Sequence, residues 1–299
     1  MRWGSAAAEV PYEHGTAAKR LPAWLRRPLA HGGEYRAVEG LLNELKLPTV
    51  CEEARCPNRG ECYASGTATF LIAGDVCTRG CRFCAVETRP PAPLDPGEPA
   101  RVAEAVQRLG LHHAVVTMVT RDDLSDGAAE HVVATIEAIR SAAPGAAVEV
   151  LVSDFGGNED AVDRVTDAAP DVFNHNLETV PRLYPDVRPG ADYARSLRVL
   201  ARVKERSPGT PTKSGLMLGL GETHDEVLAV MRDLRGAGCD LLTLGQYLRP
   251  SVAHLPVAAF VEPAEFAALA REGRKMGFSG VASAPLVRSS YHAAELARG

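Results

Sequence analysis

Residues 67–84 read TATFLIAGDVCTRGCRFC, an apolar run followed closely by three cysteines. The run over 68–73 predicts a buried strand, so Cys77, Cys81 and Cys84 would lie on a loop at its carboxyl end. Gaps of three and two residues let one loop reach three corners of a cube, and cysteine thiolates are ligands of 4Fe-4S clusters. Structural zinc prefers four ligands in paired Cys-x2-Cys knuckles, which this spacing does not supply. The pattern therefore favours an iron–sulfur cluster with one iron left open.

A second cysteine set precedes the first. Cys51, Cys56 and Cys62 follow a C-x4-C-x5-C spacing, so six of the seven cysteines fall within residues 51–84. A disulfide framework fits poorly, because the number is odd and a chain of 299 residues does not need covalent staples to fold. Alone, this set could be a zinc loop or three unrelated thiols. Beside another triad, it indicates a second cluster that also lacks one protein ligand.

Strand and helix patterns alternate after the cysteines. Strand patterns cover 67–73, 113–119, 147–152, 171–177, 213–220, 241–247 and 280–287. Helical patterns between them cover 98–110, 125–143, 158–168, 191–206, 222–237 and 262–276. Strands separated by helices of this length are typical of parallel βαβ units, and about six such units predict an α/β fold with a full or partial barrel. Before residue 48 the chain is a polar arm with one short amphipathic helix over 35–45.

Charge and composition narrow the classes of partner. The 33 Lys and Arg against 38 Asp and Glu give a net charge of −5, which offers no basic footprint for nucleic acid and no polybasic membrane anchor. No run reaches the roughly 18 apolar residues of a membrane-spanning helix. Within residues 1–20, Glu9 and Glu13 stand where a signal peptide would have its apolar core. We expect a cytoplasmic protein that binds neither nucleic acid nor membrane.

The Cys77–Cys84 spacing, with Phe83 before the last cysteine, resembles the radical S-adenosylmethionine superfamily. Residues 215–222, GLMLGLGE, are similar to a glycine-rich pattern that this superfamily carries further along the chain. The resemblance implies a partial (β/α)6 barrel in which the open iron binds the amino and carboxylate groups of S-adenosylmethionine. It also implies that Gly219 and Glu222 lie at this cofactor. Without the cysteines, such a turn would be interpreted as a plain strand-to-helix connection.

From Trp24 to Ala294 the chain resembles one family within that superfamily, lipoyl synthase. In that family the C-x4-C-x5-C set holds an auxiliary 4Fe-4S cluster, whose fourth ligand is a serine of a carboxyl-terminal Arg-Ser-Ser-Tyr motif. The resemblance assigns this role to Ser290, with Ser289 as the alternate; a hydroxyl is a poorer iron ligand than a thiolate and can be released. The motifs that carry the resemblance are CEEARCPN (51–58), GTATF (66–70), RDDL (121–124), DVFNHNLE (171–178), VRPGADY (187–193), KSGLM (213–217), LGQYL (244–248) and RSSYH (288–292).

The resemblance also implies a division of the chain into three parts. Residues 1–64 would be an extension carrying the auxiliary cluster cysteines, residues 65–278 the barrel, and residues 279–299 a second extension with the Arg-Ser-Ser-Tyr motif. The two extensions would meet at the second cluster.

The implied activity is insertion of two sulfur atoms, at C6 and C8, into an octanoyl chain on a lysine of a carrier protein. Those carbons are unactivated, so no side-chain acid or base could take their hydrogens. S-adenosylmethionine, split by the first cluster, would supply a radical, and two molecules would be used for each lipoyl group. The second of the two 4Fe-4S clusters would surrender sulfur. Implied partners are octanoylated lipoyl-carrier domains (2-oxoacid dehydrogenase E2 subunits, glycine cleavage H protein), an electron donor such as ferredoxin or flavodoxin, and an iron–sulfur carrier for cluster rebuilding.

Four polar residues are further candidate contacts of S-adenosylmethionine. Asn174, Asn176 and Glu178 share one face of the strand expected near 171–178, and in a barrel that face would point into the lumen, where unpaired polar groups are costly. Arg188 could pair with the carboxylate of the cofactor or with a nearby acid. We expect Lys213, at a strand entrance, to be structural.

Two rival interpretations stay open on the sequence. Another radical S-adenosylmethionine sulfur transferase, such as a biotin-synthase-like or methylthiotransferase enzyme, resembles the Cys77 set but not the Cys51 set coupled to the terminal serines. A zinc-stabilised binding protein without catalysis is the alternative from a different class.

Overall fold

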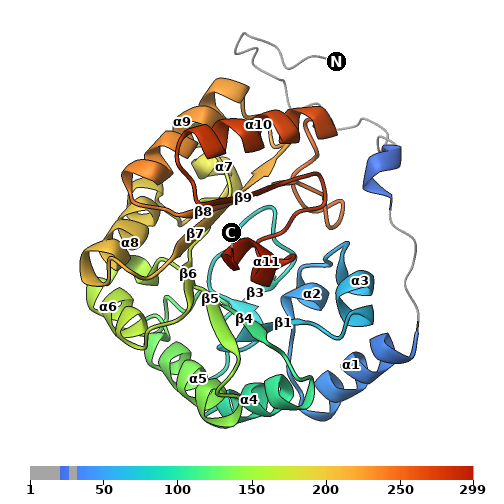
Figure 1. Cartoon of the computed structure of the whole chain (residues 1–299), viewed down its shortest axis with the longest axis vertical. Helices are drawn as coiled ribbons and strands as arrows, with labels where there is room; N and C mark the ends of the chain where they lie inside the picture. Colours follow the sequence, from blue (N-terminus) through green and yellow to red (C-terminus); the bar gives the residue numbers. More distant parts are fainter. Residues whose placement is uncertain (1–20, 27–31, 299) are drawn as a thin grey trace.

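Seven parallel strands form one sheet at the centre of the molecule (Figure 1). The computed structural model describes residues 21–26 and 32–298. The strands follow chain order from one edge of the sheet to the other, β1-β4-β5-β6-β7-β8-β9. They are β1 (Thr69–Ile72), β4 (His113–Met118), β5 (Ala147–Leu151), β6 (Val172–Asn174), β7 (Thr212–Leu218), β8 (Leu241–Gln246) and β9 (Gly280–Ser283).

One long helix connects each strand of this sheet to the next and packs on its outside (Figure 1). These helices are α4 (Glu98–Arg108), α5 (Ala129–Ala142), α6 (Glu159–Asp167), α8 (Tyr193–Arg206), α9 (His224–Gly236) and α10 (Pro263–Lys275). Every neighbouring strand pair is parallel, as six βα units require. All seven predicted strands and all six predicted helices are present, so the expected α/β partial barrel is confirmed.

Two predicted strands end earlier than expected. β6 stops at Asn174, and Glu178 has a left-handed φ of 65°. β9 stops at Ser283, because the chain turns and the Val287 N–H donates to the Ala284 carbonyl. Both segments therefore continue as irregular loops at the carboxyl edge of the sheet, where barrel proteins carry their functional residues.

Both ends of the described chain pack onto the barrel. Helix α1 (Gly33–Glu44), close to the predicted 35–45, buries Val38 and Leu42 in one apolar cluster with residues of β1, β4 and β5. β9 pairs with β8, so the sheet extends past the boundary expected at residue 278. The shorter elements are η1 (Ala23–Leu25), α2 (Val50–Glu53), α3 (Arg59–Ala64), β2 (Val76–Cys77), β3 (Glu87–Thr88), η2 (Phe155–Gly157), η3 (Pro181–Leu183), α7 (Tyr184–Val187) and α11 (Ala293–Arg298).

Local sequence explains where several outer helices begin. Asn158 and Asp192 accept backbone N–H groups at the starts of α6 and α8, and Thr223 forms a capping box with Glu226 at the start of α9. Three arginines four residues apart on α8 pair with three acids four residues apart on α6, namely Arg198 with Glu159, Arg202 with Asp163 and Arg206 with Asp167. This ladder fixes the register of two neighbouring helices.

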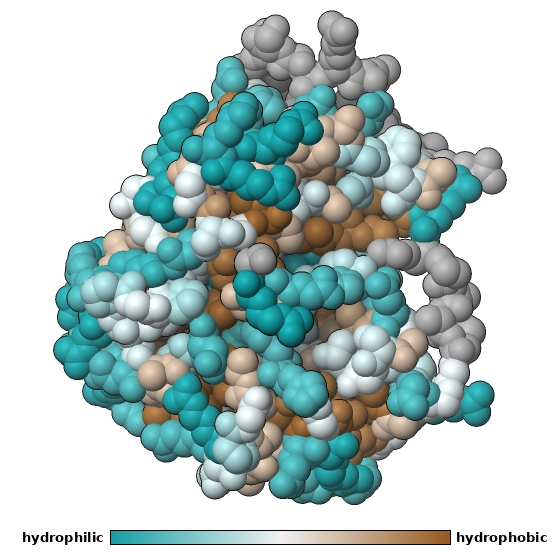
Figure 2. Space-filling view, in the orientation of Figure 1, coloured by the Kyte–Doolittle hydropathy of each residue, from teal (hydrophilic) through white to brown (hydrophobic). Residues whose placement is uncertain are grey.

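Polar and apolar side chains are unevenly distributed over the surface. Figure 2 shows hydrophilic side chains over the outer helices and hydrophobic ones gathered near the centre of that face. Within residues 21–26 and 32–298, no helix is both long enough and apolar enough to span a membrane. The prediction that residues 1–20 lack a signal-peptide core lies outside the described residues.

A buried ion pair joins β5 and β7 inside the sheet. Lys213 is fully buried, and its Nζ donates to Glu149 Oε1 at 2.8 Å. Glu149 Oε2 lies 3.3 Å from His113 Nε2, and Asn174 Nδ2 donates to Glu149 Oε1 at 3.2 Å. Burial alone would raise the pKa of Glu149, but the charge of Lys213 and the hydrogen bonds from His113 and Lys213 hold this pKa below its usual range. Lys213 is therefore placed in the structural role expected for it.

Replacing Lys213 by Ala is expected to reduce the free energy of unfolding by about 3–5 kcal/mol, because it strands the Glu149 carboxylate away from water. Lys275→Ala, which removes an exposed partner of Glu272, is the control and should leave stability unchanged.

Because the folded state lowers the pKa of Glu149, the pair stabilises the fold above the ordinary glutamate pKa of about 4.3, and this stabilisation is lost as the pH falls through the folded value. Urea unfolding at several pH values checks both points; equal losses in the two variants at neutral pH would contradict the first.

Candidate functional site

A cavity of about 330 Å³ opens at the carboxyl ends of the strands. Its wall includes Met118, Leu151, Met217 and Gln246, which lie at the carboxyl ends of β4, β5, β7 and β8. Five of the six clustered cysteines also line it, namely Cys51, Cys56, Cys77, Cys81 and Cys84. The two cysteine sets, separate in the sequence, therefore share one cavity.

The first set lies on the loop that follows β1, as predicted. Burial raises the pKa of Cys84 to about 12, and the nearby Cys81 and Cys77 raise it further in the same direction. Burial also raises the pKa of Cys81, which Arg188 lowers and Cys77 raises. The three thiols are thus close enough to repel one another as thiolates, and a bound cation would favour their deprotonation.

The second set lies on two short helices. Cys51 belongs to α2 and Cys62 to α3, with Cys56 between the two helices. Burial raises the pKa of Cys51 to about 11 and that of Cys62 to about 12, and the neighbouring cysteines of the set add to both shifts. All six cysteines are free thiols, and none of them forms a disulfide.

An arginine that sequence reasoning missed anchors the first cysteine loop. Arg79, between Cys77 and Cys81, donates from Nε and Nη2 to Asp122 at 2.8 and 2.7 Å, and its Nη2 lies 2.7 Å from Asp154 Oδ1. The Asp154 side chain is only 1% exposed, so this pair is shielded from solvent. The Arg-Asp-Asp motif at 121–123 was the available signal, because Asp122 belongs to it.

The turn between β1 and the cysteine loop is held from two sides. Ala73 has a φ of 65°, a left-handed conformation that is uncommon outside glycine. Its N–H donates to Glu98 Oε2 at 2.7 Å, and its carbonyl accepts from Arg121 Nη1 at 3.0 Å. Glu98 also lies 2.6 Å from His131 Nε2. The buried side chains of Glu98 and Arg121 therefore stabilise the strained Ala73, and this turn sets the direction in which the cysteine loop leaves β1.

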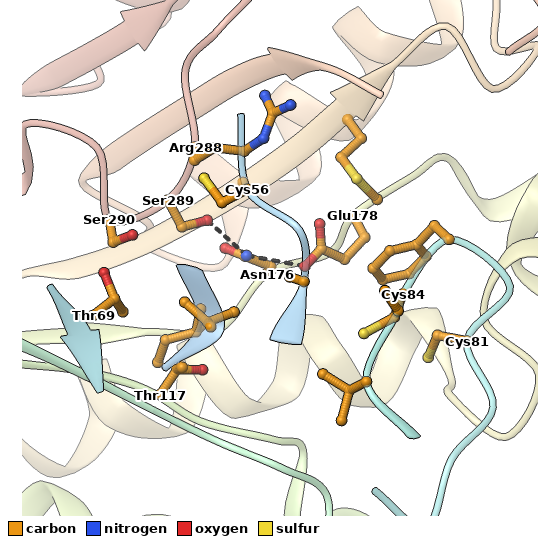
Figure 3. A pocket seen from close by; sticks show the side chains of 18 of the residues that line it. Cys56, Thr69, Cys81, Cys84, Thr117, Asn176, Glu178, Arg288, Ser289 and Ser290 are labelled. Carbon is orange, nitrogen blue, oxygen red and sulfur yellow. Dashed lines mark hydrogen bonds between the residues drawn. The ribbon is translucent and has the colours of Figure 1, made fainter. Parts of the chain in front are cut away.

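Asn176 and Glu178 lie between the two cysteine sets in the view of Figure 3, with Cys56 on one side and Cys81 and Cys84 on the other. Asn176 Nδ2 donates to Glu178 Oε1 at 3.0 Å and to a serine of the terminal motif, Ser289 Oγ, at 2.7 Å. Asn176 Oδ1 is buried and has no hydrogen-bond partner among the residues that the structure describes. An unpaired buried acceptor is costly, so a donor group of a ligand would stabilise it.

Arg188 also lines this cavity. Its Nη1 donates to the carbonyls of Asn176 and Leu177 at 3.0 Å each, while its buried Nε has no partner among the described residues. Arg188 thus holds the loop after β6 and still carries an unused donor. Burial alone would lower the pKa of Arg188, but Tyr184 and the nearby acid Glu178 raise it, while Nη1 binds backbone carbonyls and Tyr184 Oη.

Three predicted cofactor contacts lie outside the cavity wall. Asn174 does not face it, because β6 ends there and the amide binds Glu149 instead. Gly219 has a φ of 96°, and a Cβ there would come within 2.3 Å of the Ala259 carbonyl, so its glycine serves a close chain crossing. Glu222 accepts the N–H groups of Gly219 and Leu220 at 2.5 and 2.9 Å; its burial raises its pKa to about 7.

The residues of the cavity fit the groups that the sequence implies. The first set brings three free thiols to the cavity wall and the second brings Cys51 and Cys56, while Asn176 Oδ1 and Arg188 Nε offer an unused acceptor and an unused donor. Among the residues that the structure describes, no group of three or more His, Cys, Asp or Glu could hold a single metal ion. A 4Fe-4S cube is wider than one ion, so its three thiolate ligands stand further apart.

Comparisons with known proteins agree with this geometry. Residues 71–234 match the family model of the radical SAM superfamily, and residues 2–56 match that of the N-terminal domain of lipoyl synthase. The lipoyl synthase of Nitrosococcus oceani is 56% identical over 302 residues, covering all of this chain and 93% of its own. That of Methylococcus capsulatus is 58% identical, covering 93% and 86%. The structure of methylornithine synthase shares the fold, with a TM-score of 0.54 at 16% identity over 81% of this chain and 72% of its own.

Replacing Arg79 by Ala is expected to lower the free energy of unfolding by about 2–4 kcal/mol, because the buried Asp154 loses its shorter ion pair. The same variant should retain less iron at the first cysteine set than the wild type. Arg89→Ala, which removes an exposed partner of Glu87, is the matched control. Urea unfolding and iron analysis of the cluster-reconstituted proteins provide the measurements; wild-type stability in Arg79→Ala would refute the anchoring role.

Proposed function

The chain belongs to the lipoyl synthase family of the radical SAM superfamily, and we propose that it inserts sulfur at C6 and C8 of an octanoyl chain carried on a protein lysine. The family makes the chain a sulfurtransferase that uses S-adenosylmethionine and a 4Fe-4S cluster. The observation that carries the finer proposal is that the whole first triad, two thiols of the second triad (Cys51 and Cys56) and the terminal serines line one cavity.

We assign the first triad, Cys77, Cys81 and Cys84, to the cluster that binds S-adenosylmethionine, and the second triad to an auxiliary cluster. Bound there, these groups would supply a radical able to take hydrogen from an unactivated carbon and the sulfur that replaces it, at a cost of two S-adenosylmethionine molecules per lipoyl group. Asn176, Glu178 and Arg188 would bind and orient S-adenosylmethionine. Asn176 Oδ1 and Arg188 Nε support this assignment. Both are buried polar atoms without a hydrogen-bond partner among the described residues, so each could bond to the cofactor.

Asn174, Gly219 and Glu222 would stabilise the chain segments that form the cofactor site, without lining the cavity themselves. Asn174 binds Glu149 beneath the cavity, and Gly219 and Glu222 shape the chain after β7 through backbone contacts. These roles position the wall and need no direct contact with S-adenosylmethionine.

Ser290 is our candidate for the fourth ligand of the auxiliary cluster. Ser289 Oγ already accepts the Asn176 amide, whereas Ser290 Oγ forms no hydrogen bond with the residues that the structure describes. A hydroxyl without a protein partner is free to bind iron and, as a poorer ligand than thiolate, to leave it when sulfur is transferred. Ser290 would thus act both as ligand and in catalysis.

Apolar side chains of the cavity wall would hold the octanoyl chain and exclude water. The cavity wall includes Phe83, Val86, Leu151, Met217 and Leu248. A dry wall suits the reaction, because the protein must keep a reactive radical from competing partners.

The partners follow from the reaction. We propose octanoylated lipoyl-carrier domains as substrates, ferredoxin or flavodoxin as electron donor and an iron–sulfur carrier for cluster rebuilding. Six thiols that must stay reduced favour a reducing compartment such as the cytoplasm.

The activity test uses the anaerobic, cluster-reconstituted protein with an octanoylated carrier peptide, S-adenosylmethionine and dithionite. The wild type should yield lipoyl peptide. Cys77→Ala should abolish S-adenosylmethionine cleavage, whereas Cys51→Ala should keep cleavage and stop sulfur insertion. Cys239→Ala, which changes a buried thiol outside the cavity, should keep both reactions. Mass spectrometry of the peptide and quantification of 5′-deoxyadenosine separate these outcomes. Absence of lipoyl peptide from wild type with both clusters intact would reject the function.

Ser290→Ala should retain S-adenosylmethionine cleavage but lose most lipoyl formation, because the auxiliary cluster loses its releasable ligand. Its Mössbauer spectrum should change at one iron site, while Ser289→Ala, the adjacent hydroxyl, should keep the wild-type spectrum. The opposite pattern would move the ligand role to Ser289.

A further inference from the structure

The loop from Tyr247 to Leu255, between β8 and α10, touches the segments of both cysteine sets. We call these residues, 247–255, the strap. On one side, the Pro250 carbonyl accepts from Nη1 of Arg55, which lies between Cys51 and Cys56, at 3.2 Å.

On its other side, the strap binds the first cysteine loop by two hydrogen bonds. His254 Nε2 lies 2.9 Å from the carbonyl oxygen of Cys84. The N–H of Leu255 donates to the carbonyl of Arg82 at 3.1 Å. The strap therefore spans the distance between the two triads through backbone carbonyls, without using any thiol.

The hydrogen bonds of His254 define its tautomer. The Cys84 carbonyl can only accept, so the proton of the neutral imidazole must lie on Nε2. Nδ1 then accepts, and Ser251 Oγ, 2.8 Å away, donates to it. The N–H of Ala253 donates in turn to Ser251 Oγ at 3.2 Å. Ser251 thus keeps His254 in the form that can bind Cys84.

The strap is closed on itself as well. The buried Tyr247 donates from its hydroxyl to the Leu255 carbonyl at 2.8 Å, and Arg249 Nε donates to the His254 carbonyl at 2.8 Å. These bonds link the beginning of the loop to its end. A loop closed in this way resists changes in length, so it can hold two other segments at a set separation.

We propose that the strap fixes the separation of the two cysteine segments, with His254 as the positioning residue. The inference rests on the proposed function, because it concerns how hydrogen removal is matched to sulfur insertion. With the strap loosened, the first triad still supports S-adenosylmethionine cleavage, but the activated carbon no longer lies next to the sulfur donor. S-adenosylmethionine is then consumed without lipoyl product.

The test measures 5′-deoxyadenosine formed per lipoyl group, together with hydrogen exchange of residues 82–88 in the holoenzyme. His254→Ala should raise the ratio about three- to tenfold, the effect of one lost hydrogen bond on a positioned state. Its amides at 82–88 should exchange faster. Ser251→Ala removes the hydrogen bond to His254 Nδ1 but keeps the imidazole ring. It should raise the ratio and the exchange rate as well, by a smaller factor than His254→Ala. His254→Gln, whose amide nitrogen can still donate to Cys84, should restore protection in part.

His112→Ala is the matched control, because His112 is exposed in the turn before β4. It should keep the wild-type ratio and exchange. A folded His254→Ala protein with the wild-type ratio and wild-type exchange would overturn the proposal. If His254→Ala does not fold, Ser251→Ala decides in the same way. If wild type makes no lipoyl product, the proposed function fails instead, and the exchange of residues 82–88 still tests the strap.

Discussion

Parallel strand pairing is the constraint on which the site depends. Because all strands of the sheet point the same way, the loops after them emerge at one edge. The first cysteine loop follows β1, Asp122 follows β4, Asp154 follows β5, Asn176 follows β6 and the strap follows β8. A single antiparallel strand in this series would send its loop to the opposite edge and break the cavity wall.

The second constraint is that the segment of the second cysteine set must meet the carboxyl-terminal segment to close the cavity. Asn58, beside Cys56, donates from Nδ2 to the Leu286 carbonyl at 2.7 Å in a buried contact. Tyr291 donates from its hydroxyl to Glu61 at 2.7 Å. One bond precedes the Arg-Ser-Ser-Tyr motif and the other uses its last residue, so together they bring the motif to the second cysteine set. A wall built from the first and last parts of the barrel sequence is complete only after the whole chain has folded.

Sequence patterns predicted the strands, the helices and both cysteine sets, and they failed at the loops. Asn174, Asn176 and Glu178 were expected on one strand face, but β6 ends at Asn174, so alternation no longer applies to the residues after it. Asn174 therefore faces Glu149, while the other two line the cavity. The roles of Arg79 and His254 could not be predicted from hydrophobic periodicity, because each residue binds partners far away in the sequence.

The two cysteine sets and the order of elements could be derived from the chain because both are local properties. Cysteine spacing within one loop and apolar periodicity within one strand depend on neighbours a few residues apart. Which side chains share the cavity depends instead on tertiary packing. Ser289 reaches Asn176 across 113 positions, and His254 reaches Cys84 across 170. Such distances are set by how seven strands pair and how their loops turn, and no local pattern encodes them.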